Sequence, residues 1–300
     1  MTTADYEITS GAARAVITRI GAGLRAYEVA GVPYLETFPE GEHPPLGAGA
    51  VLVPWPNRVD GGVWRWQGTE QHLPITEPDR GHAIHGLVRN HEWQVLDHKA
   101  DRIELAIDIP VQPGWPVALR TTIGYVLDEK GLSVTHGVEN LGEAAVPFGV
   151  GTHPYPRAGN SVRQESELQL AGNTVLPLDP ETLMPSGPAV PVEGTEYDFR
   201  KPRSLADYDL DTPFGDCQPE ADGLIHHRLT SPHGGIEMWA DPDFRWVQAF
   251  TPPAFPGRAD GVVAFEPMTC PPNALNSGED LITLEPGQSW SGRWGLHPLV

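Results

Sequence analysis

Cysteine is almost absent from this chain of 300 residues: it has two, Cys217 and Cys270, far apart and outside any CxxC pair. The sequence therefore disfavours both a disulfide framework and a zinc ribbon. Long apolar runs are also missing, since none approaches the ~18 residues that would cross a bilayer. The N-terminal segment lacks the basic stretch and apolar core that are typical of a signal peptide. These absences predict a cytoplasmic protein that does not enter a membrane.

Positive charge is scarce, because 20 Lys and Arg residues stand against 40 Asp and Glu residues and give a formal net charge of −20. No basic run of five or more residues occurs, so the pattern excludes a nucleic-acid footprint. A negative field also opposes the long-range attraction of phosphorylated ligands, although a local arginine cluster could override it. A neutral small molecule is the partner that this charge penalises least.

Helical periodicity is missing as well. Outside Pro and Gly interruptions, no stretch of twelve residues has apolar side chains at the i, i+3, i+4, i+7 spacing. Neither GxxxxGK[ST] nor a GxGxxG that opens a helix is present, so no nucleotide cofactor is expected. The 33 Gly and 32 Pro residues are scattered between apolar runs that contain nine Trp. This mixture indicates many short strands joined by loops rather than disorder.

What the sequence does have is period-two alternation of apolar and polar residues, the pattern of half-buried strands. It occurs at 62–68, 103–109, 117–127, 132–140, 166–172, 236–241, 245–252, 261–267 and 289–299. Residues 128–131 end on a glycine and predict a hairpin turn between two of these strands. Residues 177–191 and 251–257 are expected to be long loops. We predict an all-β protein with few or no helices and a single domain over 1–300.

Two ionisable side chains stand where apolar strands end. His153 follows Phe148-Gly149-Val150-Gly151 and precedes Pro154, and Glu266 follows Val262-Val263-Ala264-Phe265. An ionised carboxylate in such a place is costly unless it is paired or useful. Apolar surroundings favour its protonated form and suit it to general acid–base chemistry. Together the two supply the acid and the base that such catalysis needs.

Other polar side chains also follow strand ends, where function concentrates. Each of them has an ordinary structural alternative. Arg58 could pair with one of the many surface carboxylates. His82 and His85 have i, i+3 spacing that supports a shared metal mainly on a helix, and their flanking glycines favour a loop, so no metal site is expected. Asp209 and Asp211 could cap turns.

Five segments in this order resemble the motifs of the aldose 1-epimerase (galactose mutarotase) family. They are PWPNRVDGGVWRWQG (54–68), HAIHG (82–86), VGTHPY (150–155), LDTPF (210–214) and FEPMTCPPNALN (265–276). The resemblance covers roughly residues 46–295. It implies a large antiparallel β-sandwich of the galactose mutarotase-like type, in agreement with the all-β prediction from the alternation.

The resemblance also implies roles for single residues. His153 matches the family's general acid, and Glu266 matches its general base. Arg58 and His85 match residues that bind the sugar hydroxyls and the ring oxygen. Asp211 matches the aspartate that binds sugar hydroxyls and is preferred over Asp209 because of its spacing to Phe214, and Asn57 is expected to support the site. Apart from the resemblance, Tyr155, Trp55 and Trp64 could offer flat surfaces for a sugar face, although Trp64 is more readily explained as a core residue. The chain departs from many members at Pro156 and Pro267, which weakens the expectation about the substrate more than that about the reaction.

The expected protein is thus an isomerase that interconverts the α and β anomers of a free aldohexose without metal, nucleotide or flavin, as a monomer or homodimer. One alternative is a hexose-6-phosphate epimerase, which Arg58, Arg80 and Arg89 near the histidine loops favour. A second is a non-catalytic sugar-binding protein with the same pocket. A third is a glycoside hydrolase that uses Glu266 and Asp211 as its two carboxylates.

Overall fold

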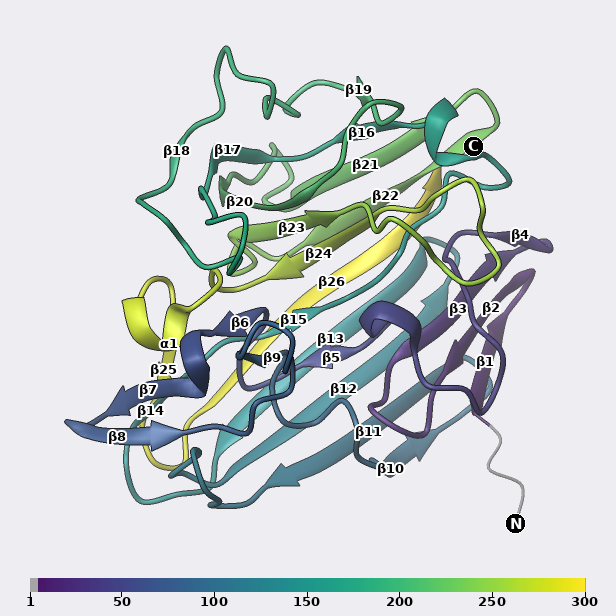
Figure 1. Cartoon of the computed structure of the whole chain (residues 1–300). Coiled ribbons are helices and arrows are strands. Elements are labelled where there is room, and N and C mark those ends of the chain that lie inside the picture. Colours follow the sequence, from purple (N-terminus) through teal and green to yellow (C-terminus); the bar gives the residue numbers. More distant parts are fainter. Residues whose placement is uncertain (1–4, 300) are drawn as a thin grey trace.

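The computed structural model describes residues 5–299, and antiparallel strands make up nearly all of its regular structure (Figure 1). In this part of the chain, the single α-helix is the four-residue α1 (Ala274–Ser277). Three 3₁₀ turns, η1 (Pro45–Gly47), η2 (Asp60–Gly62) and η3 (Arg163–Glu165), interrupt the loops. The all-β prediction is confirmed. No helix among residues 5–299 is long and apolar enough to cross a membrane.

The larger sheet has nine strands in the order β10-β11-β12-β13-β26-β22-β21-β16-β19. Their bounds are β10 (Gln94–His98), β11 (Arg102–Ile109), β12 (Leu119–Asp128), β13 (Gly131–Asn140), β26 (Ser289–Leu299), β22 (Gly234–Ala240), β21 (Ile225–Ser231), β16 (Glu167–Gln169) and β19 (Arg203–Ser204). The predicted hairpin is confirmed, because Asp128 pairs with Gly131 across the turn. The C-terminal strand β26 lies in the middle of this sheet, between β13 and β22.

The second sheet has seven strands in the order β18-β17-β20-β23-β24-β15-β5. Their bounds are β18 (Val190–Pro191), β17 (Gly172–Val175), β20 (Asp211–Cys217), β23 (Trp246–Phe250), β24 (Ala264–Met268), β15 (Gly151–Thr152) and β5 (Val51–Leu52). The prediction of one strand over 166–172 is wrong, because the chain leaves the nine-stranded sheet after Gln169 and enters this one at Gly172. Glycine is needed at that entry, since a Cβ on Gly172 would lie 2.7 Å from the Cβ of Phe214.

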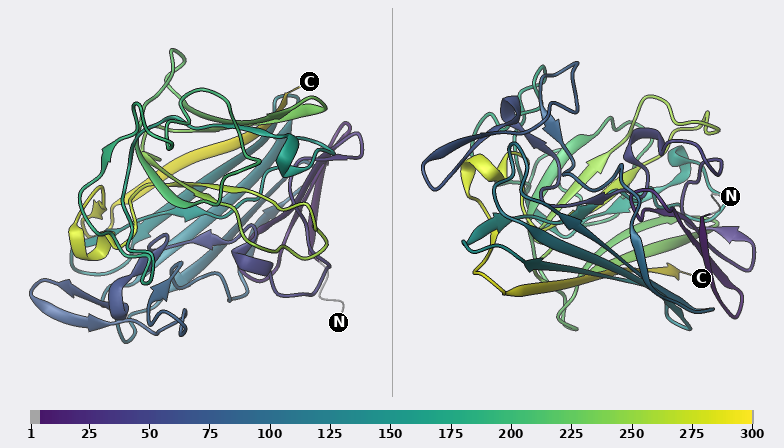
Figure 2. Two further views of the ribbon diagram at one scale, coloured as in Figure 1. Left: turned by 45° about the horizontal axis from the view of Figure 1, so that its top comes forward. Right: turned by 90° about the horizontal axis from the view of Figure 1, so that it is seen from below.

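Smaller sheets complete the fold. Strands β1 (Tyr6–Ser10), β2 (Ala13–Ile17), β3 (Leu24–Val29) and β4 (Val32–Pro33) form a four-stranded sheet. Three two-stranded pairs are β6 (Arg58–Val59) with β9 (Ala83–Ile84), β7 (Val63–Trp66) with β8 (Thr69–His72), and β14 (Val146–Phe148) with β25 (Ile282–Leu284). Strands β1–β4 and helix α1 lie at opposite ends of the molecule in each view (Figures 1 and 2).

The main core packs between the two large sheets. Ile123 and Leu132 of the nine-stranded sheet share one buried cluster with Val247 and Phe265 of the seven-stranded sheet. Along β24 the neighbours of Phe265 turn the other way, so Ala264 packs into a separate cluster on the far side. Because side chains alternate along a strand, Glu266 shares the face of Ala264 and points away from the main core. This outer face of the seven-stranded sheet carries the candidate site.

Candidate active site

Neighbouring strands place polar side chains in a row on this outer face. Glu266 of β24 lies directly opposite Gln248 of β23, and Gln248 lies opposite Pro213 of β20, two residues beyond Asp211. Residues two apart on a strand share a face, so Asp211 joins this row. On the other side of β24, strand β15 ends at Thr152 and delivers His153. Four adjacent strands thus contribute one polar group each.

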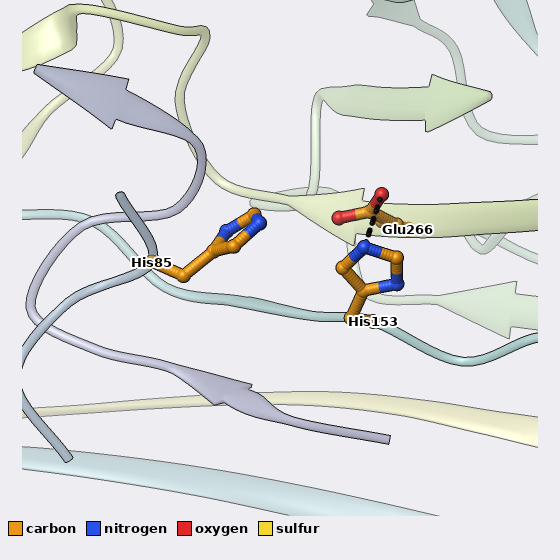
Figure 3. A group of neighbouring side chains, drawn as sticks. All are labelled: His85, His153 and Glu266. Atoms are coloured by element: carbon orange, nitrogen blue, oxygen red, sulfur yellow. Dashed lines mark ion pairs between the residues drawn. The ribbon is translucent and has the colours of Figure 1, made fainter. Parts of the chain in front are cut away.

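The imidazole of His153 contacts the carboxyl group of Glu266, with 3.2 Å between Nε2 and Oε1 (Figure 3). Both residues are buried, at 4 % and 2 % exposure. Two backbone hydrogen bonds fix His153 against the loop before β5, from its N–H to Ala50 O and from Gly49 N–H to its own carbonyl. The Nδ1 atom of His153 and the Oε2 atom of Glu266 have no hydrogen-bond partner in the described part of the chain. Proton exchange on the imidazole is therefore directed through Nε2.

Burial shifts the pKa values of His153 and Glu266 in opposite directions. Desolvation lowers the pKa of His153 to about 3, and Arg89 and Arg58 add to this effect. Desolvation raises the pKa of Glu266 well above its usual range, and the charge of Asp211 adds to it. The pair is therefore most stable as a neutral imidazole and a neutral carboxyl group. Besides the N–H of the neutral imidazole, the pair holds one ionisable proton, on the carboxyl group. The direct contact allows the two groups to exchange this proton.

His85 is the third group at this point, with its ring 5.4 Å from that of His153 between centroids (Figure 3). It and Asn57 both adopt the left-handed backbone conformation, with φ of 64° and 55°. The N–H of His85 donates to Asn57 O, and the N–H of Asn57 donates to Nδ1 of His85. An accepting Nδ1 places the proton of neutral His85 on Nε2. Burial also lowers the pKa of His85, so this Nε2–H is a neutral donor.

Arg58 crosses the cavity wall and pairs with Glu77 in a bidentate manner. Its Nε and Nη2 donate to the two carboxylate oxygens at 2.7 and 2.9 Å. Glu77 also lies 3.6 Å from Nη1 of Arg80. Arg58 does form an ion pair with a carboxylate, as the structural alternative expected. The pair is not at the surface, however, since the side chain of Arg58 is only 9 % exposed. Glu77 holds the guanidinium in a fixed orientation at the cavity.

Gln248 connects two other site residues. Its Nε2 donates to Asp211 at 2.6 Å, and its Oε1 accepts from Asn57 at 3.3 Å. Asn57 in turn accepts from the backbone N–H of Arg58. Gln248 is 1 % exposed. Its buried amide therefore holds Asp211 and Asn57 in fixed positions. Asp209, which the sequence ranked below Asp211 as a substrate-binding residue, has a side chain that is 98 % exposed.

A cavity of about 650 Å³ brings these groups together. Its lining includes six of the residues named from sequence: Asn57, Arg58, His85, His153, Asp211 and Glu266. Tyr155 is a correction, because it does not line the cavity and stacks behind His153 instead, with 5.1 Å between ring centroids. Its hydroxyl donates to Leu46 O. Trp55 and Trp64 are also core residues, at 2 % and 0 % exposure, so none of the three aromatics offers a surface to a sugar.

The one group of possible metal ligands among residues 5–299 is His85, His153 and Glu266, whose ligand atoms lie within 4.8 Å of one another. Two of these three side chains, His153 and Glu266, already contact each other directly, with 3.2 Å between Nε2 and Oε1. His82 does not share this site. Its ring nitrogens are occupied by the N–H of Gly61 and the carbonyl of Thr182.

Glu77 and Gln248 are cavity residues that the sequence did not single out, whereas Arg80 and Arg89, named there for a phosphorylated sugar, also line the cavity. Gln248 carried a usable signal, since a glutamine inside the apolar strand 245–252 has to find a polar partner. Glu77 carried none, because its loop has no periodic pattern. Its partner lies across the cavity.

Gly47 shows how tightly His153 is held. A Cβ on Gly47 would lie 3.0 Å from Cδ2 of His153, and its φ of +76° already disfavours a side chain. We expect Gly47→Ala to displace the imidazole and lower kcat by about 10- to 100-fold, the scale of a misplacement near 1 Å. Gly41→Ala is the matched control, since Gly41 has a similar φ and open space around it. Equal rates for the two variants would contradict a positioning role of Gly47.

The pairing of Arg58 with Glu77 predicts a stability effect. Glu77→Gln leaves a buried guanidinium without its counter-charge and is expected to lower the free energy of unfolding by about 3 kcal/mol. Urea unfolding measures it. Glu70→Gln is the control, because Glu70 pairs with Arg65 at an exposed position and such pairs contribute about 0–1 kcal/mol. A Glu77 variant as stable as the control would show that this pair does not hold the wall together.

The fold and the site define a class: an antiparallel β-sandwich with a buried acid–base pair in a polar cavity. The comparisons with known proteins are consistent with this description. The model of the aldose 1-epimerase family matches residues 4–297, so the chain belongs to the aldose 1-epimerase family. It is a sugar epimerase of the mutarotase-like type, and therefore an isomerase.

Individual relatives agree. The YihR protein of Escherichia coli K12 is 33% identical over 286 residues, which cover 94% of this chain and 89% of that protein. Human galactose mutarotase is 31% identical over 166 residues, 52% of this chain and 46% of its own length. A solved aldose epimerase homologue from C. elegans superimposes with a TM-score of 0.86 at 17% identity and 99% coverage of both chains. This last likeness concerns the fold.

Proposed function

We propose that this protein interconverts the α and β anomers of a free aldohexose by opening and reclosing the sugar ring. The observation that carries the proposal is the contact of His153 with Glu266, a buried acid–base pair that holds one proton in a cavity of about 650 Å³. Mutarotation needs an acid and a base that act on two oxygens of the same carbon. No cofactor enters the reaction.

The reaction begins when Glu266 passes its proton to His153 through their direct contact. In the opening step, the ionised Glu266 then takes the proton from the C1 hydroxyl while the protonated His153 gives one to the ring oxygen. The C1–O5 bond breaks, and the electron pair of the O–H bond forms the aldehyde. Glu266 is then protonated and His153 is neutral, which is the protonation state that burial favours for the free pair. Rotation about C1–C2 presents the other face of the aldehyde. Reclosure reverses both proton transfers and restores the pair.

The other cavity residues bind and orient. The neutral Nε2–H of His85 donates to a sugar oxygen near the reacting centre, and Arg58, held by Glu77, donates to hydroxyls with its remaining N–H groups. Asp211, fixed by Gln248, accepts from hydroxyl groups. Donors and acceptors on different sides of the cavity restrict the sugar ring to one orientation. Positioning of this kind supplies a large part of the rate enhancement.

Polarimetry of freshly dissolved α-D-glucose and α-D-galactose tests the proposal. The expected result is a relaxation rate that rises in proportion to protein concentration for at least one of them. Methyl glycosides, which cannot open, are expected to stay unchanged. Release of methanol from a methyl glycoside would favour a hydrolase that uses Glu266 and Asp211. Binding of a sugar with no change in relaxation would favour a non-catalytic sugar-binding protein.

The lowered pKa of His153 predicts how its imidazole titrates. Because desolvation lowers its pKa to about 3, its imidazole is expected to stay neutral as the pH falls through the usual histidine range, near 6.5. Imidazole ¹⁵N NMR shifts measure this, and comparison with His153→Gln assigns the signals. A midpoint near 6.5 would mean that the imidazole is not desolvated in the free protein.

A further inference from the structure

Glu36 is a buried carboxylate that does not line the acid–base cavity. Its side chain is 5 % exposed and faces two arginines. Nη1 of Arg258 lies 2.8 Å from Oε1 of Glu36 and donates to Oε2 at 3.1 Å, while Nη1 of Arg157 lies 3.7 Å from Oε2. Desolvation raises the pKa of Glu36, and the two arginines oppose that shift. Burying three charged groups is costly, so their arrangement calls for an explanation.

The backbone of Glu36 lies against the segment that follows His153. The N–H of Glu36 donates to the carbonyl of Tyr155 at 2.8 Å. In the opposite direction, the N–H of Arg157 donates to the carbonyl of Tyr34 at 2.9 Å. These two hydrogen bonds join the segments as a short antiparallel pair. Glu36 therefore fixes the main chain of Tyr155.

The side chain of Glu36 holds a loop that packs on the ring of Tyr155. Arg258, the closer of its two partners, also donates from Nη2 to Ser161 O and from its backbone N–H to Phe255 O. Phe255 is buried and contacts Tyr155, with 4.9 Å between the ring centroids. Glu36 thus holds Tyr155 from two directions, directly by its own N–H and indirectly through Arg258 and Phe255.

Tyr155 in turn lies directly behind the imidazole of His153. The two rings stack with 5.1 Å between their centroids and 23° between their planes. The hydroxyl of Tyr155 donates to Leu46 O, which prevents the ring from sliding along the imidazole. A fixed ring behind His153 sets the direction in which Nε2 points, toward Glu266. A displacement of about 1 Å near the reacting atoms can slow a reaction about 100-fold.

We propose that Glu36 is a positioning residue of the reaction, which holds Tyr155 in place and thereby aims the imidazole of His153 at Glu266 and at the ring oxygen. The effect on rate rests on the proposed function, whereas the arrangement itself exists without a sugar. If Glu36 served stability alone, its loss would lower the unfolding temperature and leave the imidazole in its native place.

Aromatic proton NMR of the free protein tests the arrangement without any sugar. The ring current of the stacked Tyr155 shifts the ring-proton signals of His153 upfield, and comparison with His153→Gln assigns these signals. Glu36→Gln removes the charge that holds Arg258, so we expect the signals to move downfield, toward those of an unstacked histidine. Phe255→Leu keeps the ion pair but loosens the same ring, and it is expected to cause a shift in the same direction. Glu36→Asp is expected to retain part of the native shift.

Polarimetry then measures the consequence for the reaction. We expect Glu36→Gln to lower kcat by about 10- to 100-fold. KM is expected to change little, because neither Glu36 nor Arg258 lines the cavity. Glu237→Gln is the matched control, since Glu237 pairs with Arg228 at 2.7 Å in β22 of the nine-stranded sheet and its side chain is 17 % exposed. Both variants are expected to unfold at a lower temperature, but only Glu36→Gln is expected to change kcat and the His153 signals.

His153 signals that keep their native shifts in folded Glu36→Gln would overturn the proposal, as would a loss of kcat that Glu237→Gln shares. If Glu36→Gln does not fold, Glu36→Asp and Phe255→Leu decide in its place, and native signals in both would overturn the proposal. If the signals move as expected while the unmodified protein accelerates no sugar, the proposed function fails and the arrangement behind His153 stands. Thermal unfolding of each variant confirms that it is folded.

Discussion

Glu266→Gln is expected to lower the catalysed rate of anomer exchange by about 10²- to 10⁴-fold, the usual contribution of a positioned acid or base. Gln matches the shape of Glu and can still hydrogen-bond to His153, but its amide cannot take up a proton from the C1 hydroxyl. Polarimetric relaxation under saturating sugar measures kcat, and calorimetry measures binding. Affinity for sugar is expected to change little, because Glu266 reacts with the substrate more than it holds it.

Glu129→Gln is the control, since Glu129 lies exposed in the turn between β12 and β13 and is far from the pair in the sheet order. A Glu266 variant with a rate close to that of the control would remove this carboxyl group from the mechanism. A variant that loses binding and rate together would assign Glu266 to sugar binding instead.

His153→Gln is expected to cause a loss of the same size, because the ring oxygen then has no acid to protonate it. The double variant with Glu266→Gln is expected to be about as slow as either single variant, since groups that act as a unit give non-additive losses. His233→Gln, at an exposed histidine, is the control. Losses that multiply in the double variant would show that the two groups act in separate steps.

The structure brings together three residues that the sequence named, because the sheet order β20-β23-β24-β15 places His153, Asp211 and Glu266 side by side. Only His153 directly follows the end of its strand, since Asp211 begins β20 and Glu266 lies in the middle of β24, which continues to Met268. Their spacing in the sequence does not contain that order. The pairing of distant strands in one sheet depends on long-range packing, and the resemblance to a family supplied what the pattern could not.

Three errors of the sequence-based prediction have physical causes. Tyr155 was expected to offer a flat ring to the sugar, yet the chain turns it behind the imidazole of His153, where ring stacking and its hydroxyl hydrogen bond to Leu46 O hold it. The strand expected over 166–172 is split, because local alternation does not tell one sheet from another. Glu77 was missed because its role is to pair with Arg58, and the local sequence does not reveal that partner.

Exchange NMR on an equilibrium mixture of anomers in D₂O tests the central claim most directly. At equilibrium no net change occurs, so faster exchange between the α and β anomeric proton signals reports interconversion alone. The account predicts that catalytic amounts of the protein accelerate this exchange for glucose, galactose or glucose 6-phosphate while the proton on C2 is retained. Deuterium incorporation at C2 would mean enolisation instead of ring opening, and unchanged exchange for all three sugars would contradict the proposed function.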